Sequence, residues 1–441
     1  MISSLIQWFK PAPHVPRLAI AEVEPFYRRC RWQVLEAAFI GYATFYLVRK
    51  NLPIVSKEMG ADLGYSPSQI GDILFATAIS YGIGKFLMGS LSDRSNPRKF
   101  IAVGLLLTAF CNFAFGAARS YPVHLALWTL NGLFQAMGYG PGARTLAHWY
   151  SFKERGAAFG FWNISHNLGG GLVGVIAAES AVRFGGWQAA FYVPGALATI
   201  CAIYLFWRMR DTPQSVGLPP IEEFKHDSPP AEKEEHEREL TARELFLKYI
   251  LPNKYLWLIA IANFFVYIAR NCMIDWGPTF LKEVKHASIH GGGLSTLIIE
   301  FSGGAGMFFM GWLSDRFGGR RGAISAVCMV PLLGAFAALM FTPSDQLWLD
   351  MTLFGVIGFF VYAPVMMLGV MSLDLTSKKA VGTAAGFVGM FGYFGSAVQG
   401  KGIGWIVHHY QNWNYALAAV FVSTVIAIVL LAFTWNVKPR G

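Results

Sequence analysis

The chain has 441 residues, of which 54% are hydrophobic and 14% are charged, and its mean hydropathy is +0.42. A typical soluble domain carries about 25% charged residues, so this composition argues against an ordinary water-soluble enzyme or binding module. The formal net charge of +10 does not indicate nucleic-acid binding, because the cations are scattered over short loops and form no basic patch.

Long apolar runs fall into two groups on either side of a polar stretch. A membrane-spanning helix needs about 20 mostly apolar residues, and about twelve runs meet this requirement. The first group covers residues 33–54, 67–91, 99–118, 122–148, 156–181 and 187–208. The second group covers residues 254–281, 291–313, 321–341, 346–373, 380–405 and 411–436. We therefore expect an all-α membrane protein with about twelve transmembrane helices in two six-helix bundles.

Lysines and arginines in the short loops predict how these helices cross the membrane. The cationic loops after the second, fourth and eighth runs and before the eleventh all fall on one side. Cytoplasmic loops carry such an excess of cations, so both termini are expected to be cytoplasmic. The predicted division is a cytoplasmic tail at 1–32, a bundle at 33–209, a linker at 210–253, a second bundle at 254–436 and a tail at 437–441.

The two polar segments have different expected roles. Residues 1–32 lack the apolar core of a cleavable signal peptide, and the basic loops are expected to attract anionic membrane lipid. The proline-rich stretch 210–253 has linker composition. Within it, Thr241 and Glu244 resemble a capping box, which predicts a short helix on the membrane surface. The scattered cysteines predict neither a disulfide framework nor a metal site.

Three short motifs occur twice at nearly the same separation. The segments ending at Arg49 and Arg270 each close an apolar run with Tyr-x-x-Arg and lie 221 residues apart (270 − 49). The Gly-x-x-x-Asp-Arg turns ending at Arg94 and Arg316 lie 222 residues apart (316 − 94). A glycine- and alanine-rich segment recurs at an offset of 226. The two bundles are therefore expected to be related by pseudo-two-fold symmetry.

Ionisable side chains inside the apolar runs are costly and usually functional. Most of them here are cations, which predicts an anionic ligand. A guanidinium fork matches the oxygens of a phosphate group. Each of Arg49 and Arg270 could instead reach the outer membrane surface. Their paired positions favour a clamp for one small dianion.

Other side chains in the same runs could complete such a site. Lys85 could add a third positive charge, or reach the cytoplasmic interface instead. His166 could donate a hydrogen bond to the ligand, or be a packed core histidine. Further candidates for substrate binding are Asn163, Tyr42, Tyr46, Tyr267, Tyr362 and Tyr393.

A second set of charged residues is predicted to control opening. Lys50, Asp275 and Glu300 could form a network that bridges the halves and that the anionic ligand displaces. The alternative is a static structural ion pair.

The paired Gly-x-x-x-Asp-Arg turns are predicted to latch neighbouring helices on the cytoplasmic face. Asp93 and Asp315 are the acidic residues of these turns, and Arg144 is expected to pair with Asp93. The second half has Met366 at the offset of 222 from Arg144, so the two latches need not be equivalent.

These residues resemble those of the major facilitator superfamily, and within it the organophosphate:phosphate antiporters. The resemblance runs nearly end to end. It is carried by Arg49-Lys50-Asn51, the turn from Gly89 to Arg94, Leu251-Pro252-Asn253-Lys254, Asp275-Trp276 and the Trp162-Asn163-x-x-His166-Asn167 helix. The runs 211–223 and 280–286 look most like the branch that carries glycerol-3-phosphate.

The resemblance implies exchange of external organophosphate for internal inorganic phosphate across a bacterial inner membrane, by rocking of the two bundles. It implies that Arg49 and Arg270 bind the phosphoryl group with help from Lys85, His166 and Tyr267. No cofactor and no enzymatic activity are expected, and a monomer should be functional. Glycerol-3-phosphate is the preferred substrate. The alternatives are a hexose phosphate, a phosphoglycerate, or a role as a membrane sensor of sugar phosphate.

Two helices depart from the resembled branch. Residues 138–142 read Gly-Tyr-Gly-Pro-Gly, where that branch usually has Gly-Trp-Pro-Pro-Cys. Residues 300–306 read Glu-Phe-Ser-Gly-Gly-Ala-Gly, where Glu-Tyr-Ala-Gly-Ile-Pro-Gly is usual. These changes are expected to alter the part of the pocket that meets the organic tail, and to leave phosphate recognition intact.

Overall fold

A computed structural model describes residues 7–92, 95–226, 246–376 and 381–437. Within these ranges every regular element is helical. The helices of the first half are α2 (Ile20–Leu47), α3 (Leu52–Leu63), α4 (Pro67–Ser92), α5 (Pro97–Ala117), α6 (Tyr121–Gln135), α7 (Tyr139–Trp149), α8 (Phe152–Arg183) and α9 (Ala189–Arg208). Two short elements follow, η1 (Pro213–Val216) and α10 (Ile221–Lys225).

The second half repeats this plan with fewer interruptions. It begins with the short element η2 (Phe246–Ile250). Its helices are α12 (Lys254–Asp275), α13 (Gly277–Val284), α14 (Ile289–Arg316), α15 (Arg321–Phe341), α16 (Leu347–Asp374), α17 (Val381–Tyr410) and α18 (Trp413–Ala432).

Three of the predicted continuous runs are broken, each close to a proline. The run 33–54 divides between α2 and α3 near Pro53, the run 122–148 divides between α6 and α7 ahead of Pro141, and the run 254–281 divides between α12 and α13 ahead of Pro278. Four other prolines lie inside α2, α9, α15 and α16, where membrane helices tolerate them. At the three breaks each proline stands in the first turn of the following helix, where its missing N–H would have no partner in any case. These prolines therefore start new helices.

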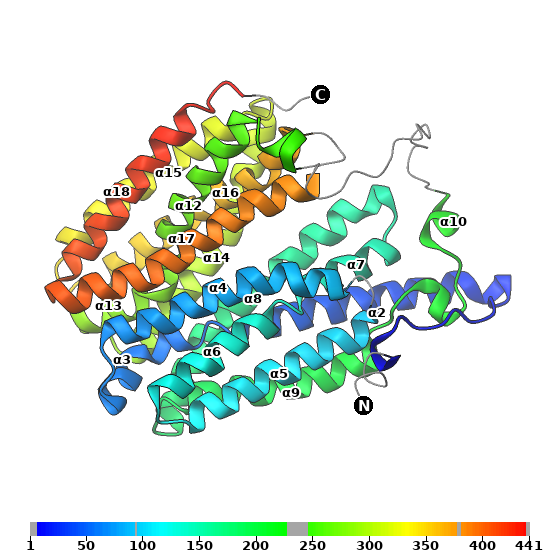
Figure 1. Ribbon diagram of the computed structural model, residues 1–441, viewed down its shortest axis with the longest axis horizontal. Coiled ribbons are helices and arrows are strands. Elements are labelled where there is room, and N and C mark those ends of the chain that lie inside the picture. The colour runs from blue at the N-terminus through cyan, green and yellow to red at the C-terminus, as the bar shows by residue number, and fades with distance from the viewer. Residues whose placement is uncertain (1–6, 93–94, 227–245, 377–380, 438–441) are drawn as a thin grey trace.

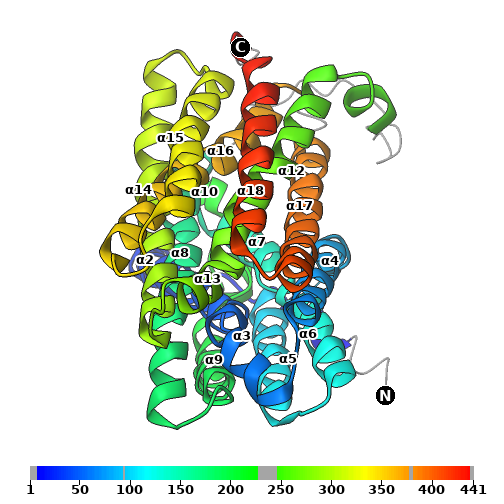
Figure 2. The same ribbon diagram turned by 90° about the vertical axis from the view of Figure 1, so that its left-hand side faces the viewer.

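The two halves form two groups of helices that lie against each other (Figures 1 and 2). Contacts between the groups run mainly along α4 with α17 and α8 with α14, and α3 also contacts α13. We call the end that holds α3 and α13 the distal end, and the opposite end, near Ser92 and Lys254, the terminal end. In Figure 1 the groups meet toward the distal end at the left and diverge toward the right.

Glycines set the closest approaches between the halves. A Cβ placed on Gly174 of α8 would stand 2.2 Å from the carbonyl oxygen of Gly293 on α14, and the converse distance is also 2.2 Å. At the other interface, a Cβ on Gly71 of α4 would stand 2.7 Å from the carbonyl oxygen of Gly400 on α17. Small residues allow such backbone contact between membrane helices. Both crossings lie toward the distal end.

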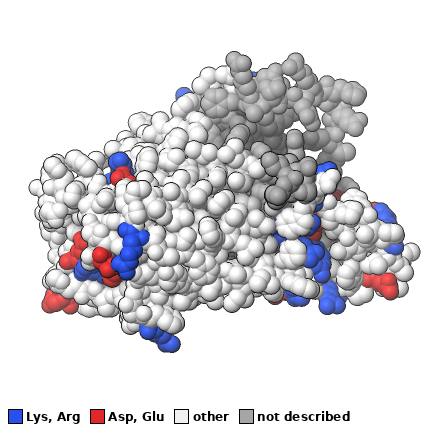
Figure 3. Space-filling view, turned by 60° about the horizontal axis from the view of Figure 1, so that its bottom comes forward, with Lys and Arg blue, Asp and Glu red and all other residues white. Residues whose placement is uncertain are grey.

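The surface agrees with a membrane-embedded protein. Seven of the described helices are long and apolar enough to cross a membrane by length and composition. In Figure 3, Lys, Arg, Asp and Glu gather near the two ends, and a broad band without charge lies between them. Large apolar side chains are exposed on the long helices, including Phe110 of α5, Ile200 of α9 and Phe308 of α14. Such a surface is stable in lipid, where apolar groups need no burial.

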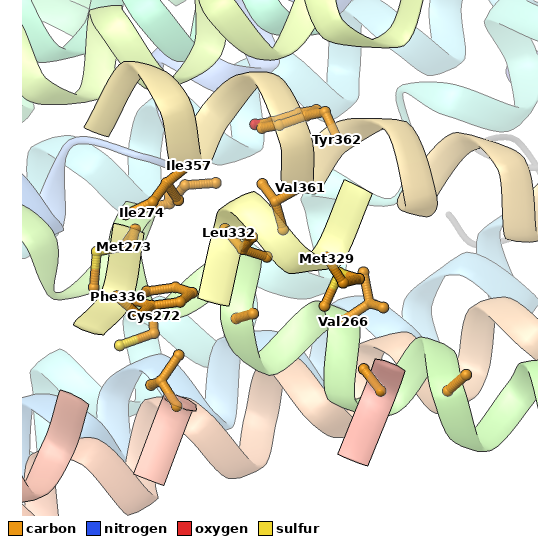
Figure 4. Close-up of a cluster of buried hydrophobic side chains, with 14 of the residues drawn as sticks. Val266, Cys272, Met273, Ile274, Met329, Leu332, Phe336, Ile357, Val361 and Tyr362 are labelled. Atoms are coloured by element: carbon orange, nitrogen blue, oxygen red, sulfur yellow. The ribbon is translucent and has the colours of Figure 1, made fainter. Parts of the chain in front are cut away.

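Each half has its own apolar core. In the second half, Val266 of α12, Phe336 of α15 and Ile357 of α16 belong to one buried cluster (Figure 4). Interlocked packing of this kind holds helices of one group in fixed relative positions.

The first part of the predicted linker is folded onto the first half. The N–H of Leu18 donates to the carbonyl of Gly217 (2.9 Å), and the N–H of Ala12 donates to the Asp211 carboxylate (2.7 Å). Trp149 of α7 donates its indole N–H to the Asp211 carbonyl (2.9 Å). The expected surface helix after Thr241 lies largely outside the described residues. Only its end is seen, as η2, in which Ile250 is buried.

Candidate functional site

A cavity of about 460 Å³ lies between the two halves. Its walls come from α2, α3, α4, α6, α7 and α8 of the first half and from α12, α14, α16 and α17 of the second. The structure brings every side chain predicted to bind substrate to this one cavity: Tyr42, Tyr46, Arg49, Lys85, Asn163, His166, Tyr267, Arg270, Tyr362 and Tyr393. Lys50 and Asp275 also line it.

Arg49 lies just after the end of α2, where the backbone turns toward α3. Its guanidinium carbon is 4.1 Å from the ring centre of Tyr81 and 5.1 Å from that of Tyr46. Aromatic faces attract a cation without neutralising it. Among the described residues, no carboxylate lies within ion-pair distance of Arg49, so its charge stays available to a ligand.

Arg270 lies inside α12, one turn before that helix ends. Its Nη2 donates to the hydroxyl of Tyr362 (2.9 Å), and its guanidinium carbon is 4.4 Å from the Tyr362 ring centre and 5.8 Å from that of Tyr267. Its Nε is buried and has no hydrogen-bond partner within the described part of the chain. A buried unpaired donor is costly unless a ligand accepts from it.

Lys85 of α4 is surrounded by tyrosine rings. Its Nζ lies 5.4 Å from the ring centre of Tyr81, 5.0 Å from that of Tyr139 and 4.9 Å from that of Tyr393. The lysine therefore points into the cavity, and the alternative in which it reaches the cytoplasmic interface does not describe this structure.

Tyrosine rings connect the arginines across the halves. The ring of Tyr393 lies 5.2 Å from that of Tyr81, which covers Arg49, and 5.9 Å from that of Tyr267, which lies beside Arg270. Tyr81 and Tyr139 were not among the predicted binding residues, although the segment 138–142, which contains Tyr139, was expected to alter the pocket. Tyr81 lies one helical turn before Lys85 and shares its face, so helical spacing alone could have identified it.

His166 of α8 lies at the centre of the positive field. Its Nδ1 contacts the carbonyl oxygen of Asn163, and its ring centre is 5.6 Å from that of Tyr46. The charges of Arg270, Arg49 and Lys85 all act on this ring. Since Nδ1 is engaged with a carbonyl, Nε2 is the nitrogen that remains to face a ligand.

A buried ion pair closes the distal side of the cavity. Lys50 Nζ lies 2.9 Å from Asp275 Oδ1, and Gln399 Nε2 donates to Asp275 Oδ2 (2.8 Å). Glu300 does not join this pair by a hydrogen bond. It accepts instead from Asn167 Nδ2 (3.0 Å), across the interface of α14 with α8. The charges of Arg270 and Lys50 nevertheless act on Glu300, so Glu300 is linked to the pair electrostatically and not by a direct ion pair in the described structure.

A further layer of contacts links α3 with α13 nearer the distal surface. Lys282 Nζ lies 2.5 Å from the Glu58 carboxylate and donates to the Ile54 carbonyl (2.7 Å). The hydroxyls of Ser56 and Thr279 are 2.7 Å apart. Sequence reasoning missed this layer, because the loop cation Lys282 carried no signal that it would be buried against the other half.

The proposed terminal-end latch is described only in part. Asp93 and the side chain of Asp315 lie outside the described residues. Arg144 of α7 lies away from the cavity and donates to the carbonyls of Ser92 (3.0 Å) and Ser95 (2.5 Å). It therefore holds the backbone of the Gly-x-x-x-Asp-Arg turn.

The all-helical fold with a cation-lined cavity between two related halves defines a membrane transporter of the major facilitator type. Residues 38–400 match the sequence model of the family described as "Major Facilitator Superfamily", and the chain belongs to this superfamily. A solved bacterial homologue of the human lysosomal transporter Spinster, inward-facing and unoccupied, has a TM-score of 0.72 at 17% identity, over 92% of this chain and 95% of that one. That likeness shows the fold.

Two relatives with curated names match almost end to end. The "Glycerol-3-phosphate transporter" of Bacillus subtilis is 40% identical over 99% of both chains. The "Probable hexose phosphate transport protein" of Chlamydia pneumoniae is also 40% identical, over 99% of this chain and 98% of that protein. Equal identity to both leaves the organic part of the substrate to be argued from the cavity.

Proposed function

We propose that this protein is an antiporter of the bacterial inner membrane that exchanges external organophosphate for internal inorganic phosphate by alternating access. Glycerol-3-phosphate is the preferred organophosphate. Both termini are cytoplasmic in this proposal, so the distal end faces outward. A hexose phosphate is the alternative substrate, supported by the second relative.

The observation that carries the proposal is the placement of Arg49 and Arg270 in one cavity, from helices α2 and α12 of opposite halves. Two planar guanidinium groups can bind one phosphoryl group from two sides with charge-assisted hydrogen bonds. Neither arginine has a carboxylate within ion-pair distance in the described structure. Lys85, also in the lining, adds a third cation on the first-half side.

Charge explains why transport would be an exchange. Near neutral pH a phosphate monoester carries about two negative charges, since its second pKa is about 6. Inorganic phosphate has a similar charge. Closing an empty cavity would bury these cations together without a counter-ion, which is costly. Bound organophosphate or bound inorganic phosphate lowers that cost, so the change between the outward-open and inward-open states requires one of the two anions in the cavity.

The interface supports a rocking motion. The distal contacts made by Lys50 with Asp275 and by Lys282 with Glu58 cross between the halves and are polar, so they can break and re-form as the halves rotate. The cavity reaches Gly369 and Ala385 toward the terminal end. Alternating access in this superfamily uses such rigid-body movement around a central site.

The test is uptake of labelled glycerol-3-phosphate into proteoliposomes loaded with inorganic phosphate. Fast uptake is expected with phosphate inside, and background uptake without it. Rapid uptake into phosphate-free vesicles lacking any counter-anion would contradict the exchange mechanism. Binding of sugar phosphate without any transport would favour the sensor instead.

A further inference from the structure

We infer that the terminal end of the first half carries a binding site for one anionic phospholipid. The site lies where the start of α5, the end of α9 and the segment before α2 meet. Arg98, Lys99 and Arg210 bind the lipid phosphate, and the acyl chains lie along α5 and α9. Scattered basic loops predict only a general attraction to anionic lipid, whereas these residues define one place. The site is separate from the central cavity and does not rest on the proposed function.

Three cations meet at this place without a carboxylate. Arg98 and Lys99 lie in the first turn of α5, and Arg210 lies two residues beyond the end of α9. The charge of Arg210 acts on the Arg98 guanidinium, so these two groups are close enough to repel each other. Within the described ranges, no carboxylate lies within ion-pair distance of any of the three. Grouping like charges is unfavourable unless an anion joins them.

Other cations at this end are arranged differently. Four arginines of the first half have a carboxylate partner there: Arg17 with Glu223, Arg28 with Glu24, Arg31 with Glu154 and Arg208 with Glu36. A general excess of positive charge on one side of a membrane is satisfied by scattered residues. It does not require three unpaired cations to be held together, so their grouping indicates a ligand.

The two arginines are held in place by the carbonyl groups at the end of α9. Arg98 donates through Nε to the Phe206 carbonyl, and Arg210 donates through Nη1 to the Trp207 carbonyl (2.9 Å). These bonds use one nitrogen of each guanidinium. Both Nη nitrogens of Arg98 and Nη2 of Arg210 have no partner in the described part of the chain. They are donors in fixed positions for phosphate oxygens.

Two tryptophans place the three cations at the membrane–water interface. The ring of Trp8 stacks on that of Phe206, with ring centres 6.3 Å apart and an interplanar angle of 11°. Lys99 donates to the Trp8 carbonyl (2.7 Å), and its Nζ lies 4.8 Å from the Trp8 ring centre. Trp207 is 73% exposed. Indole rings concentrate at the headgroup level of a bilayer, where cations meet lipid phosphate.

An exposed apolar stripe leads to a cation on each helix. On α9, Ile203 and Trp207 are exposed four residues apart, and Arg210 follows three residues later. On α5, Leu106 is exposed seven residues after Lys99, so the two share a face. The helices α5 and α9 pack against each other and lie along the lower edge of Figure 1, the side that comes forward in Figure 3.

This combination fits a phospholipid better than a soluble phosphate. Figure 3 shows Lys and Arg gathered at the terminal end of this face, next to the band without charge. A phospholipid has one phosphate at the interface and two chains in the apolar layer, so it contacts the cations and the stripes together. A soluble phosphate ester would contact the cations alone.

The first experiment measures the lipid preference of the full-length protein in uncharged detergent. Phosphatidylglycerol and phosphatidylcholine with identical chains are titrated, and the melting temperature is recorded. Saturating inorganic phosphate is present throughout, so the central cavity is in the same state in every sample. We expect phosphatidylglycerol to stabilise at a concentration lower by about fivefold or more, the effect of one interfacial cation or more. Equal effects of the two lipids would overturn the inference.

A further sample contains glycerophosphoglycerol, the headgroup of phosphatidylglycerol without its chains. We expect no stabilisation at the concentrations where the lipid acts. If the headgroup alone matched the lipid, the site would bind a soluble phosphate ester and the assignment to lipid would be wrong.

The second experiment removes two of the cations. Lys99→Gln combined with Arg210→Gln should weaken the preference for phosphatidylglycerol by about fivefold for each cation removed. The melting temperature in phosphatidylcholine should stay unchanged. Arg17→Gln combined with Arg28→Gln is the matched control, because it removes the same charge from the same end and should keep the preference. Equal loss in both double variants would show a general attraction and reject the site.

A third measurement uses the wild type alone and so does not depend on the folding of variants. Phosphatidylglycerol with a photoreactive group in its acyl chain is irradiated with the protein, and labelled peptides are identified. We expect label on α5 or α9, suppressed more strongly by unlabelled phosphatidylglycerol than by phosphatidylcholine. Label confined to other helices, or suppressed equally by both lipids, would overturn the inference. Loss of phosphate exchange would contradict the proposed function and leave these lipid results unchanged.

Discussion

Lys50 of the first half and Asp275 of the second half form a buried ion pair of 2.9 Å on the distal side of the cavity. Their side chains are only 10% and 7% exposed. The pair therefore links the two halves, and it lies next to Arg49, the residue before Lys50 in the chain. In the proposed transport cycle, an anion bound at Arg49 changes the electrostatic field at Lys50, its neighbour in sequence, and this change would couple ligand binding to closure of the distal end.

Breaking this pair should slow exchange. Removing one member of a buried ion pair leaves an uncompensated charge, at a cost of about 3–5 kcal/mol. We expect Asp275→Asn to favour opening of the distal end and to reduce phosphate exchange. Spin-label distances across the distal end and exchange rates measure the two effects. The swap of Lys50→Asp with Asp275→Lys should restore part of the activity, and no recovery would argue that orientation matters more than pairing.

The arginine clamp should be sensitive to conservative replacement. Arg49→Lys and Arg270→Lys keep the positive charge but lose the planar fork that binds two phosphate oxygens. We expect each to raise KM for phosphate by about tenfold or more. Arg183→Lys is a matched control, because that arginine is 72% exposed and pairs with Glu179 within one helix. Equal loss in the control would point to a general folding defect.

The glycine crossings should tolerate no side chain. A methyl group at Gly293 would stand 2.2 Å from the Gly174 carbonyl oxygen, so Gly293→Ala should prevent close approach of α8 and α14. The expected result is reduced exchange and greater accessibility of the distal end to a thiol reagent at an introduced cysteine. Gly334→Ala is the control, since a Cβ at Gly334 of α15 meets no atom within 4 Å. Normal transport by Gly293→Ala would mean that the crossing is not needed.

The terminal end should lose stability in acid through Glu154. Burial alone would raise the pKa of Glu154, but Arg31 and Lys225 outweigh it and lower this pKa below its ordinary value. A carboxyl with a lowered native pKa contributes stability above its unfolded pKa, and this contribution is lost as the pH falls through the native pKa.

We therefore expect the melting temperature in detergent to fall as the pH drops below about 4.3, the ordinary value for glutamate. Glu154→Gln should melt at a lower temperature than the wild type at neutral pH and show a weaker dependence on acid. An identical pH profile in both proteins would assign the acid sensitivity to other groups.

Much of the site followed from residue type and order along the chain. A permanent cation within an apolar run is costly and usually functional, so Arg49 and Arg270 could be identified as site candidates from the sequence. Their occurrence in the same motif indicated two related halves. Helical periodicity placed the candidate tyrosines in the same runs. Lipid admits only helices and closed barrels, and the long apolar runs lack the short alternating segments of a barrel, so their length and composition by themselves indicated the all-helical class.

The tertiary structure decided how the halves meet. No local signal pairs Glu300 with Asn167, buries Lys282 against Glu58 or sets Gly174 against Gly293, because each contact joins segments more than one hundred residues apart. Such contacts depend on helix crossing positions, which are fixed by side-chain packing over whole interfaces. The sequence by itself determined which charges lie within the membrane, and only packing decided which of them remain free to bind an anion.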